Sequence, residues 1–154
     1  MPKPKQAPRK TLVADARRTV DSCAGMNSRL AARRITRFLE GRLRGTGLGI
    51  AQFGLMAHIA AAGRDDTIGV LAERAGLDQS TLSRNLRQLA RAGLIEIVLV
   101  EKDLRRRAVW LTEAGARRLE AAMPVWRRAQ VELSRIIKPD AVRKLAISAA
   151  ALAD

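Results

Sequence analysis

The chain has 154 residues, of which 29 are basic and 15 acidic, and its formal net charge is +14. This length predicts one domain with appended helices, and a hydrophobic share of 47% is enough to form a core, which excludes wholesale disorder. No apolar run is long enough to span a bilayer, and no secretory signal is apparent. We therefore expect a cytoplasmic protein that does not contact membranes and whose partner is a polyanion.

Cysteine and histidine are too scarce for several kinds of chemistry. The single cysteine, Cys23, excludes an internal disulfide and a cysteine-only metal site, and the single histidine, His58, leaves little for a zinc site or a catalytic triad. No glycine-rich phosphate loop, metal-ligand cluster or nucleophile–base pair is apparent. RNA binding is disfavoured because aromatic residues make up only 3% of the chain. We expect no enzyme, no metal and no cofactor.

The first part of the chain predicts a tail followed by helices. Residues 1–10 contain three prolines and four basic residues, which predicts a disordered basic tail that serves either solubility or contact with DNA. A helical pattern runs from Thr11 to about Arg44. Gln52–Ala62 then predicts a short, mostly buried helix.

Two helices joined by a tight turn predict a helix-turn-helix. Thr67–Ala75 has the pattern of one helix, and Asp78 can cap the next, which runs to about Ala92. The apolar residues of both helices would pack together and leave polar residues of the second helix facing outward. The candidate DNA-contacting residues on this second helix are Gln79, Ser80, Thr81, Arg84, Asn85 and Arg87.

Such a helix fits the major groove of DNA, where its N-terminal residues reach base edges. Arg84 can bind a guanine through two hydrogen bonds, and Gln79 or Asn85 can bind an adenine. The hydroxyl groups of Ser80 and Thr81 can hold phosphates and so fix the register of the protein on the duplex. The alternative is that this helix packs on another protein.

A hairpin is predicted after the second helix. Ile95–Val100 and Ala108–Leu111 have strand composition, and the charged stretch Lys102–Arg107 between them predicts the turn. A hairpin in this position is a wing, whose arginines can enter a narrow minor groove, and an aspartate can orient an arginine by a bidentate pair. The candidate wing residues are Asp103, Arg105, Arg106 and Arg107, with a solvated charged turn as the alternative.

Two more helices are predicted at the C-terminus. Thr112 can cap a long helix over Glu113–Ile137, and Pro124 should kink it. Pro139 suits the first position of a last helix that ends near Asp154.

The stretch from about Ala51 to Gly115 resembles the winged-helix core of the multiple-antibiotic-resistance regulator (MarR) family. The residues that carry the resemblance, in order along the chain, are Leu71-Ala72, Gly76-Leu77, Ser80-Thr81-Leu82-Ser83-Arg84, Leu89, Gly93-Leu94-Ile95, Asp103-x-Arg105 and Leu111-Thr112-x-x-Gly115. The helices on either side also fit, so the resemblance covers nearly the whole chain after the first ten or so residues. One departure lies in the first wing strand, where the family usually carries basic residues and this chain has Ile97 and Val98. An apolar strand there would pack on a neighbouring helix.

The resemblance implies a mainly α fold with a small β-hairpin wing, in which a winged helix-turn-helix core is flanked by dimerisation helices. The implied segments are a tail (1–10), an N-terminal dimerisation helix (11–48), the DNA-binding domain (49–111) and C-terminal dimerisation helices (112–154). It also implies that Ser80, Thr81 and Arg84 act in the major groove, and that Arg105, oriented by Asp103, acts in the minor groove.

The function implied is that of a homodimeric transcriptional regulator, expected to be a repressor, on a pseudo-palindromic duplex in a bacterium or archaeon. Its DNA affinity would fall when a small molecule or an oxidant acts at the domain junction, and an unidentified aromatic or phenolic compound is the candidate effector. The alternative is a constitutive architectural protein that coats DNA without sequence preference, which a charge of +14 would also permit.

Cys23 is a candidate redox sensor because some branches of the family sense peroxides through one cysteine near the start of the first helix. Arg17, Arg18 and Arg29 are near in sequence and would favour the thiolate, whereas Asp21 would oppose it. Those branches also rely on tyrosine near the thiol, and this chain has none. The alternative is a small buried hydrophobic residue.

Overall fold

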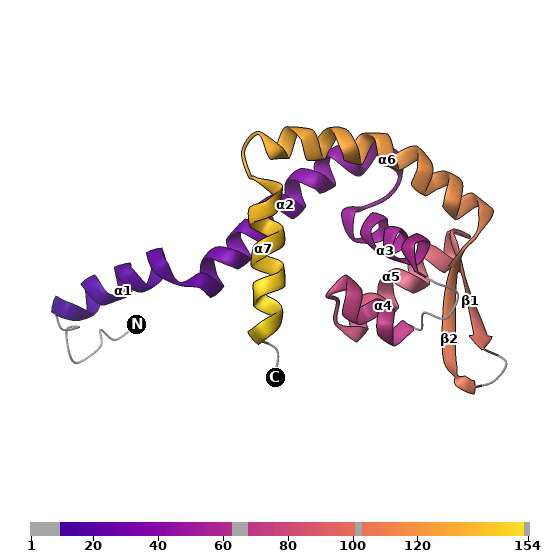
Figure 1. The fold of residues 1–154 in the computed structure, drawn as a ribbon, viewed down its shortest axis with the longest axis horizontal. Helices are drawn as coiled ribbons and strands as arrows, with labels where there is room; N and C mark the ends of the chain where they lie inside the picture. The colour runs from indigo at the N-terminus through magenta and orange to yellow at the C-terminus, as the bar shows by residue number, and fades with distance from the viewer. Residues whose placement is uncertain (1–9, 63–67, 101–102, 153–154) are drawn as a thin grey trace, which may run out of the picture. The chain divides into compact units, whose positions relative to one another are not determined.

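The computed structural model describes residues 10–62, 68–100 and 103–152 (Figure 1). The predicted tail therefore lies outside the described residues, apart from Lys10. In chain order the elements are α1 (Lys10–Ser22), α2 (Ala24–Leu43), η1 (Arg44–Thr46), α3 (Ile50–Ala61), α4 (Ile68–Ala75), α5 (Gln79–Arg91), β1 (Ile95–Val100), β2 (Asp103–Leu111), α6 (Glu113–Ser134), α7 (Pro139–Ala149) and η2 (Ala150–Leu152). The predicted fold class, mainly α with a two-stranded antiparallel hairpin, is confirmed.

The chain divides into two units, Met1–Phe38 and Leu39–Asp154, and the second contains the hydrophobic core. Leu43 and Met56 are completely buried in this core, to which α3, α4, α5, β1 and α6 contribute. The rings of Phe53 and Trp126 stack with their centroids 5.9 Å apart, which joins α3 to the middle of α6. Figure 1 shows α3, α4, α5 and the hairpin gathered on one side of α6.

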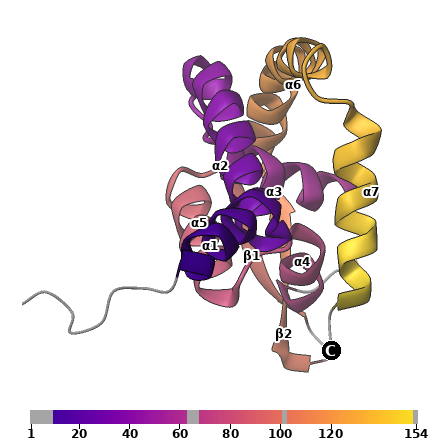
Figure 2. The same cartoon turned by 90° about the vertical axis from the view of Figure 1, so that its left-hand side faces the viewer.

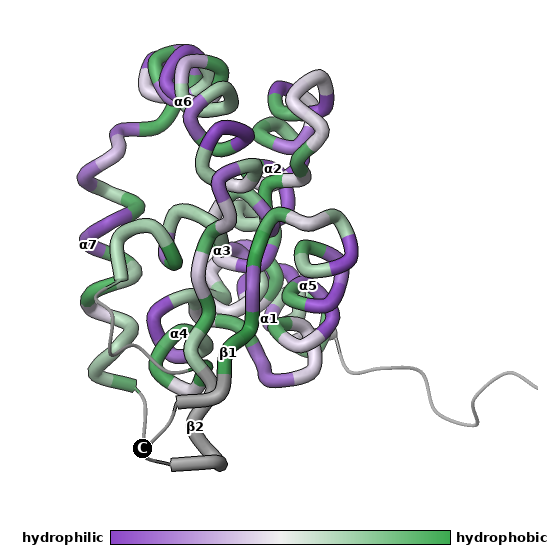
Figure 3. Tube along the Cα trace, turned by 90° about the vertical axis from the view of Figure 1, so that its right-hand side faces the viewer, coloured by the Kyte–Doolittle hydropathy of each residue, from purple (hydrophilic) through white to green (hydrophobic). Residues whose placement is uncertain are grey.

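The helix-turn-helix forms as predicted, and the apolar residues of α4 and α5 are buried in one shared core. Leu71 of α4 is buried, and so are Leu82, Leu86 and Leu89 at helical spacing on α5. Gly76 ends α4 with a φ of +60°, a backbone conformation that favours glycine. Figure 2 shows α4 and α5 against the hairpin, and Figure 3 shows hydrophilic residues along the outer side of α5.

The hairpin differs from its prediction at the turn. The sequence predicts a turn over Lys102–Arg107, whereas β2 already begins at Asp103. Leu99 pairs with Arg107 and Val100 with Asp103, with an irregular register between these two pairs. Strand pairing is made by backbone groups, so a run of charged residues does not by itself exclude a strand. The three arginines therefore belong to a strand and not to a turn.

Among the residues of the first wing strand whose burial is described, Ile95 at its start is the one that packs in the core. Ile95 is 3% exposed and β1 contacts α5, but Ile97 is 39% exposed and Val98 44%. The expected packing of this strand on a neighbouring helix is thus seen at Ile95 and not at Ile97 or Val98.

The residue that caps α6 is hydrogen-bonded to two residues just after the C-terminal end of α5. The Thr112 hydroxyl accepts a hydrogen bond from the Gly115 amide at 3.0 Å, as the predicted cap requires, and donates one to the Gly93 carbonyl at 2.6 Å. The Thr112 amide donates to the Leu94 carbonyl at 3.1 Å. A Cβ atom at Gly115 would collide with this same Leu94 carbonyl oxygen, so only glycine fits there.

The last two helices end earlier than predicted. The long helix α6 continues through Pro124 and ends at Ser134, three residues before Ile137. Pro139 opens α7, as predicted, and η2 follows α7 up to Leu152. No residue of α7 is buried. Its side chains Leu145 and Ile147 are 58% and 61% exposed.

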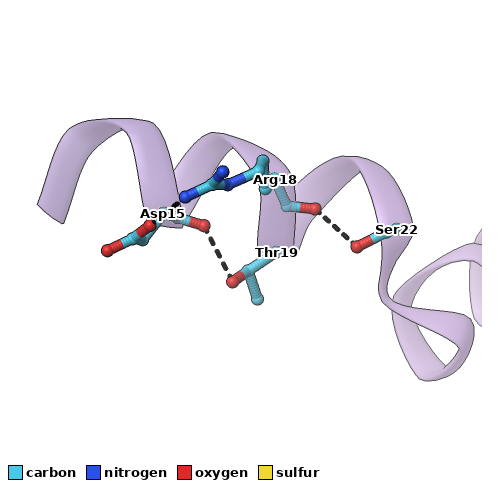
Figure 4. Close-up of polar contacts among 4 residues, drawn as sticks. All are labelled: Asp15, Arg18, Thr19 and Ser22. Atoms are coloured by element: carbon cyan, nitrogen blue, oxygen red, sulfur yellow. Dashed lines mark hydrogen bonds and ion pairs between the residues drawn. The ribbon is translucent and has the colours of Figure 1, made fainter. Parts of the chain in front are cut away.

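The predicted helix from Thr11 to Arg44 is interrupted at Cys23, which separates α1 from α2. Near the end of α1, the hydroxyls of Thr19 and Ser22 donate to backbone carbonyls four residues earlier, Asp15 and Arg18, at 2.9 and 2.7 Å (Figure 4). Such bonds compete with the regular helical pattern and often bend helices. No described residue of α1 is buried. Among the described residues, no helix could serve as a membrane span.

Candidate nucleic-acid interface

The first turn of α5 is organised by Asp78, its N-cap residue. One carboxylate oxygen of Asp78 accepts from the Thr81 amide at 2.8 Å and from the Ser80 hydroxyl at 2.6 Å. The other oxygen accepts from the Thr81 hydroxyl at 2.8 Å. The Ser80 hydroxyl, followed by the amide and hydroxyl of Thr81, holds the pKa of Asp78 far below its usual value. Asp78 is therefore ionised at neutral pH, and both hydroxyls are already bound to it.

The predicted contact residues of α5 do not all face solvent equally. Gln79, Ser80, Arg84 and Arg87 are exposed, and the last three share one helix face through their i, i+4, i+7 spacing. Thr81 and Asn85 are half-buried, so they sit at the edge of this face.

Two of these side chains bond to their own helix. The Asn85 amide group donates to the Thr81 carbonyl at 3.1 Å, and Nε of Arg87 donates to the Ser83 carbonyl at 3.3 Å. Arg84 makes no hydrogen bond or ion pair within the described part of the chain. Arg84 is therefore the member of the face whose guanidinium has all of its donors available for a ligand.

The wing residues of the predicted site lie on β2. The backbone of Asp103 and of Arg107 pairs with β1, and Arg105 and Arg106 lie between them. Their side chains are outside the described part of the structure, so the proposed pairing of Asp103 with Arg105 stays a prediction.

The structure adds one residue to the set chosen from the sequence. Asp78 was expected to cap α5, but its two extra bonds to Ser80 and Thr81 make it part of the same surface. The signal in the sequence is the spacing of an aspartate two and three residues before hydroxyl residues, which is common at helix starts and does not by itself indicate a ligand site.

Cys23 occupies the break between α1 and α2 and is half-buried. Its backbone amide donates to the Thr19 carbonyl at 2.9 Å, and its carbonyl accepts from the Asn27 amide at 3.0 Å. Within the described residues the thiol makes no hydrogen bond. No cluster of histidine, cysteine or acidic residues in that part of the chain could hold a metal ion.

A cavity of about 420 Å³ lies between η1 and α6. Its lining residues are Arg42, Gly45, Thr46, Arg118, Ala121 and Val125. The Arg42 guanidinium binds the Glu132 carboxylate, while the Arg118 guanidinium lies over Gly47, where a Cβ atom would be only 2.6 Å from its Nη1. The cavity thus combines an apolar wall on α6 with guanidinium groups.

Known proteins share both the sequence pattern and the fold. A model of the MarR family matches residues 46–106, and no curated protein matches the chain. The M. tuberculosis transcriptional regulator MosR, solved in complex with DNA, is 32% identical, with a TM-score of 0.76 over 85% of this chain and 96% of MosR.

More distant structures share the fold. MarR from E. coli, in its apo form, is 23% identical, with a TM-score of 0.64 over 85% of this chain and 97% of MarR. CouR from Rhodococcus jostii, solved with p-coumaroyl-CoA, is 19% identical, with a TM-score of 0.68 over 84% of this chain and 90% of CouR. Together with the family match and the likeness to MosR, the winged helix-turn-helix geometry leads to one conclusion: the chain belongs to the MarR family of transcriptional regulators.

Proposed function

We propose that the chain is a homodimeric, sequence-specific DNA-binding regulator that represses transcription in the cytoplasm of a bacterium or archaeon and is not an enzyme. The observation that carries the proposal is the exposed face of Ser80, Arg84 and Arg87 on a helix-turn-helix whose relative MosR, 32% identical, is solved with DNA. The net charge of +14 supports a polyanionic partner.

In this proposal α5 enters the major groove and the wing reaches the minor groove. Arg84 supplies the specific contact, because its guanidinium can bind the O6 and N7 atoms of a guanine. Gln79, at the start of the helix, and Arg87, one turn further on, flank it. On the wing, Arg105 would enter the minor groove, with Asp103 to orient it and Arg106 and Arg107 beside it.

The helices at both ends of the chain support a dimer. Leu12 and Val20 on α1 are 55% and 59% exposed, and Val142 and Leu145, which share one face of α7 through their i, i+3 spacing, are 42% and 58% exposed. Exposed apolar surface is costly in water, and a partner that covers it removes this cost. A second copy of the chain would cover it and would place two α5 helices on the two halves of a pseudo-palindrome.

The cavity between η1 and α6 is our proposed effector site. Its apolar wall of Ala121 and Val125 suits an aromatic ring, and Arg118 suits a carboxylate. Benzoate should therefore bind more tightly than phenol, and the Arg118→Gln variant should lose this preference. Equal binding of benzoate to the variant and the wild type, measured by calorimetry, would place the effector elsewhere.

The proposal is tested by binding to DNA upstream of the chain's own gene, in excess random competitor at near-physiological salt. A discrete complex that resists competitor is expected, because specific and non-specific affinities differ by about 10³-fold to 10⁷-fold. Binding that competitor abolishes would favour the architectural alternative, or an operator elsewhere that selection from random DNA would reveal.

The same assay tests Cys23 as the oxidant sensor. Peroxide should release wild-type protein from DNA, whereas the Cys23→Ser variant should stay bound. If both proteins keep their complex in peroxide, Cys23 is a packing residue and the signal is a small molecule.

A further inference from the structure

Two hydroxyl groups at the start of α5 share one carboxylate. Ser80 and Thr81 lie 2.6 and 2.8 Å from the two oxygens of Asp78. An ionised carboxylate can only accept hydrogen bonds, so the hydrogen in each of these bonds belongs to the hydroxyl. The lowered pKa of Asp78 keeps the carboxylate ionised throughout the neutral range.

This arrangement limits what the two hydroxyls can offer to DNA. A hydroxyl has one hydrogen to donate, and here Asp78 takes it, which leaves only oxygen lone pairs. Phosphate oxygens also only accept hydrogen bonds, so neither hydroxyl can hold a phosphate while it is bound to Asp78. The negative charge of Asp78 further opposes a phosphate at this place.

We propose that Asp78 converts Ser80 into a hydrogen-bond acceptor that reads the amino group of an adenine or a cytosine in the major groove. This inference rests on the proposed function and replaces the phosphate-holding role expected for Ser80 and Thr81. Ser80 is exposed, so its lone pairs are open to a base edge. Thr81 is half-buried and acts as a positioning residue that holds the second carboxylate oxygen of Asp78.

The chemistry of the groove fits this assignment. The hydrogen-bond donors that bases present there are N6 of adenine and N4 of cytosine, whereas guanine presents acceptors. Arg84 lies one helical turn after Ser80 on the same face and can only donate. The surface of α5 therefore presents a hydrogen-bond acceptor, Ser80, about one helical turn, or about 5.4 Å, before a hydrogen-bond donor, Arg84. We expect each half-site to have an amino-bearing base within about one or two base pairs of a guanine.

The test uses the full chain and a duplex selected by it from random DNA. Each adenine of one half-site is replaced in turn by purine, and each cytosine by 2-pyrimidinone, which removes only the amino group. For wild-type protein, one position should cost about threefold to tenfold in affinity, the worth of one hydrogen bond. The Ser80→Ala variant should bind the duplex that lacks this amino group as tightly as it binds the unmodified duplex. The matched control is Ser83→Ala, an exposed serine of the same helix that Asp78 does not bind, and it should keep the wild-type response.

A second set of duplexes separates a base contact from a phosphate contact. One phosphate at a time is replaced by an uncharged methylphosphonate. If Ser80→Ala removes the response to a methylphosphonate and not to a missing amino group, Ser80 holds a phosphate and the inference is wrong. If the variant changes neither response, Ser80 does not contact DNA and the inference is equally wrong. Failure of the wild-type chain to select any sequence would instead overturn the proposed regulator. The Thr81 amide still caps α5 in Ser80→Ala, so its circular dichroism spectrum should match the wild type.

Discussion

The interior of the second unit and the helices at the two ends of the chain contrast in how they are stabilised. In the interior, residues such as Leu43 at the end of α2 and Met56 on α3 are completely buried. On α1 and α7 no described residue is buried, although both helices carry large apolar side chains. The difference teaches that one part of this chain can fold through its own contacts, while the other carries surface suited to a second copy.

The largest expected effect is a loss of stability caused by a substitution at Gly115, in the packed interior. In Gly115→Ala the new methyl group would collide with the Leu94 carbonyl, and backbone cannot move aside as a flexible side chain can. We expect a loss of about 3 kcal/mol or more in the free energy of unfolding, measured with urea. Gly41→Ala, where a Cβ atom meets nothing within 4 Å, is the control and should not destabilise. Equal stabilities of the two variants would show that the α5–α6 junction is not tightly packed.

The next largest effect should arise on α7 and should leave the interior intact. Leu145→Glu places a charge on a residue that is 58% exposed in the single chain, so the fold should tolerate it. In a dimer the same charge would be buried, which should weaken association by about 30-fold or more in sedimentation experiments. Arg143→Glu, nearly opposite on the helix, is the control. A Leu145→Glu protein that associates like wild type would exclude this face of α7 from the dimer interface.

Arg84 allows a sharper comparison, because it belongs to the well-packed unit but is exposed to solvent. We expect Arg84→Ala to keep the unfolding midpoint and to lose about tenfold to 100-fold in operator affinity, with a relaxed base preference. Arg91→Ala, at the other end of α5, should bind with unchanged base preference. Wild-type affinity for Arg84→Ala would contradict the docking of α5 proposed above.

Asp78 should produce the smallest effect, visible through pH. Its pKa is lower in the folded chain than in the unfolded chain, so it stabilises the fold above the ordinary aspartate value of about 3.9. This contribution is lost as the pH falls below that value and the carboxylate gains a proton. Wild type should therefore be more stable than Asp78→Asn at pH 7, and the difference should shrink steadily below about pH 4. A difference that does not vary with pH would show that Asp78 is not ionised in its cap.

The sequence predicted the helix-turn-helix well because its signals are local. Leucines at helical spacing, Gly76 and the cap residue Asp78 each act within a few residues, and the structure confirms all three. The start of β2 was missed because the charge of residues 102–107 suggested a turn, while strand pairing depends on a partner backbone. The predicted segments 11–48, 49–111 and 112–154 stay a prediction, as do the roles of the contact residues.

Within the candidate site, the sequence identified which residues face outward but not what they offer to a ligand. The bonds of Asn85 and Arg87 to their own helix, and of Ser80 to Asp78, depend on side-chain geometry that composition does not encode. Residue type predicts a capacity to bond, whereas the neighbours decide how much of that capacity remains.

The hydrogen bonds that join the end of α5 to the start of α6 have a consequence for the wing. The hairpin begins after Leu94 and ends before Thr112, and the Thr112 amide donates a hydrogen bond to the Leu94 carbonyl. This bond closes the base of the hairpin and holds the end of α5 close to the start of α6. Because Ile95 and Ala108 near its base are buried, only the part of the hairpin beyond these two residues could differ in length or charge between relatives without a change in the helices.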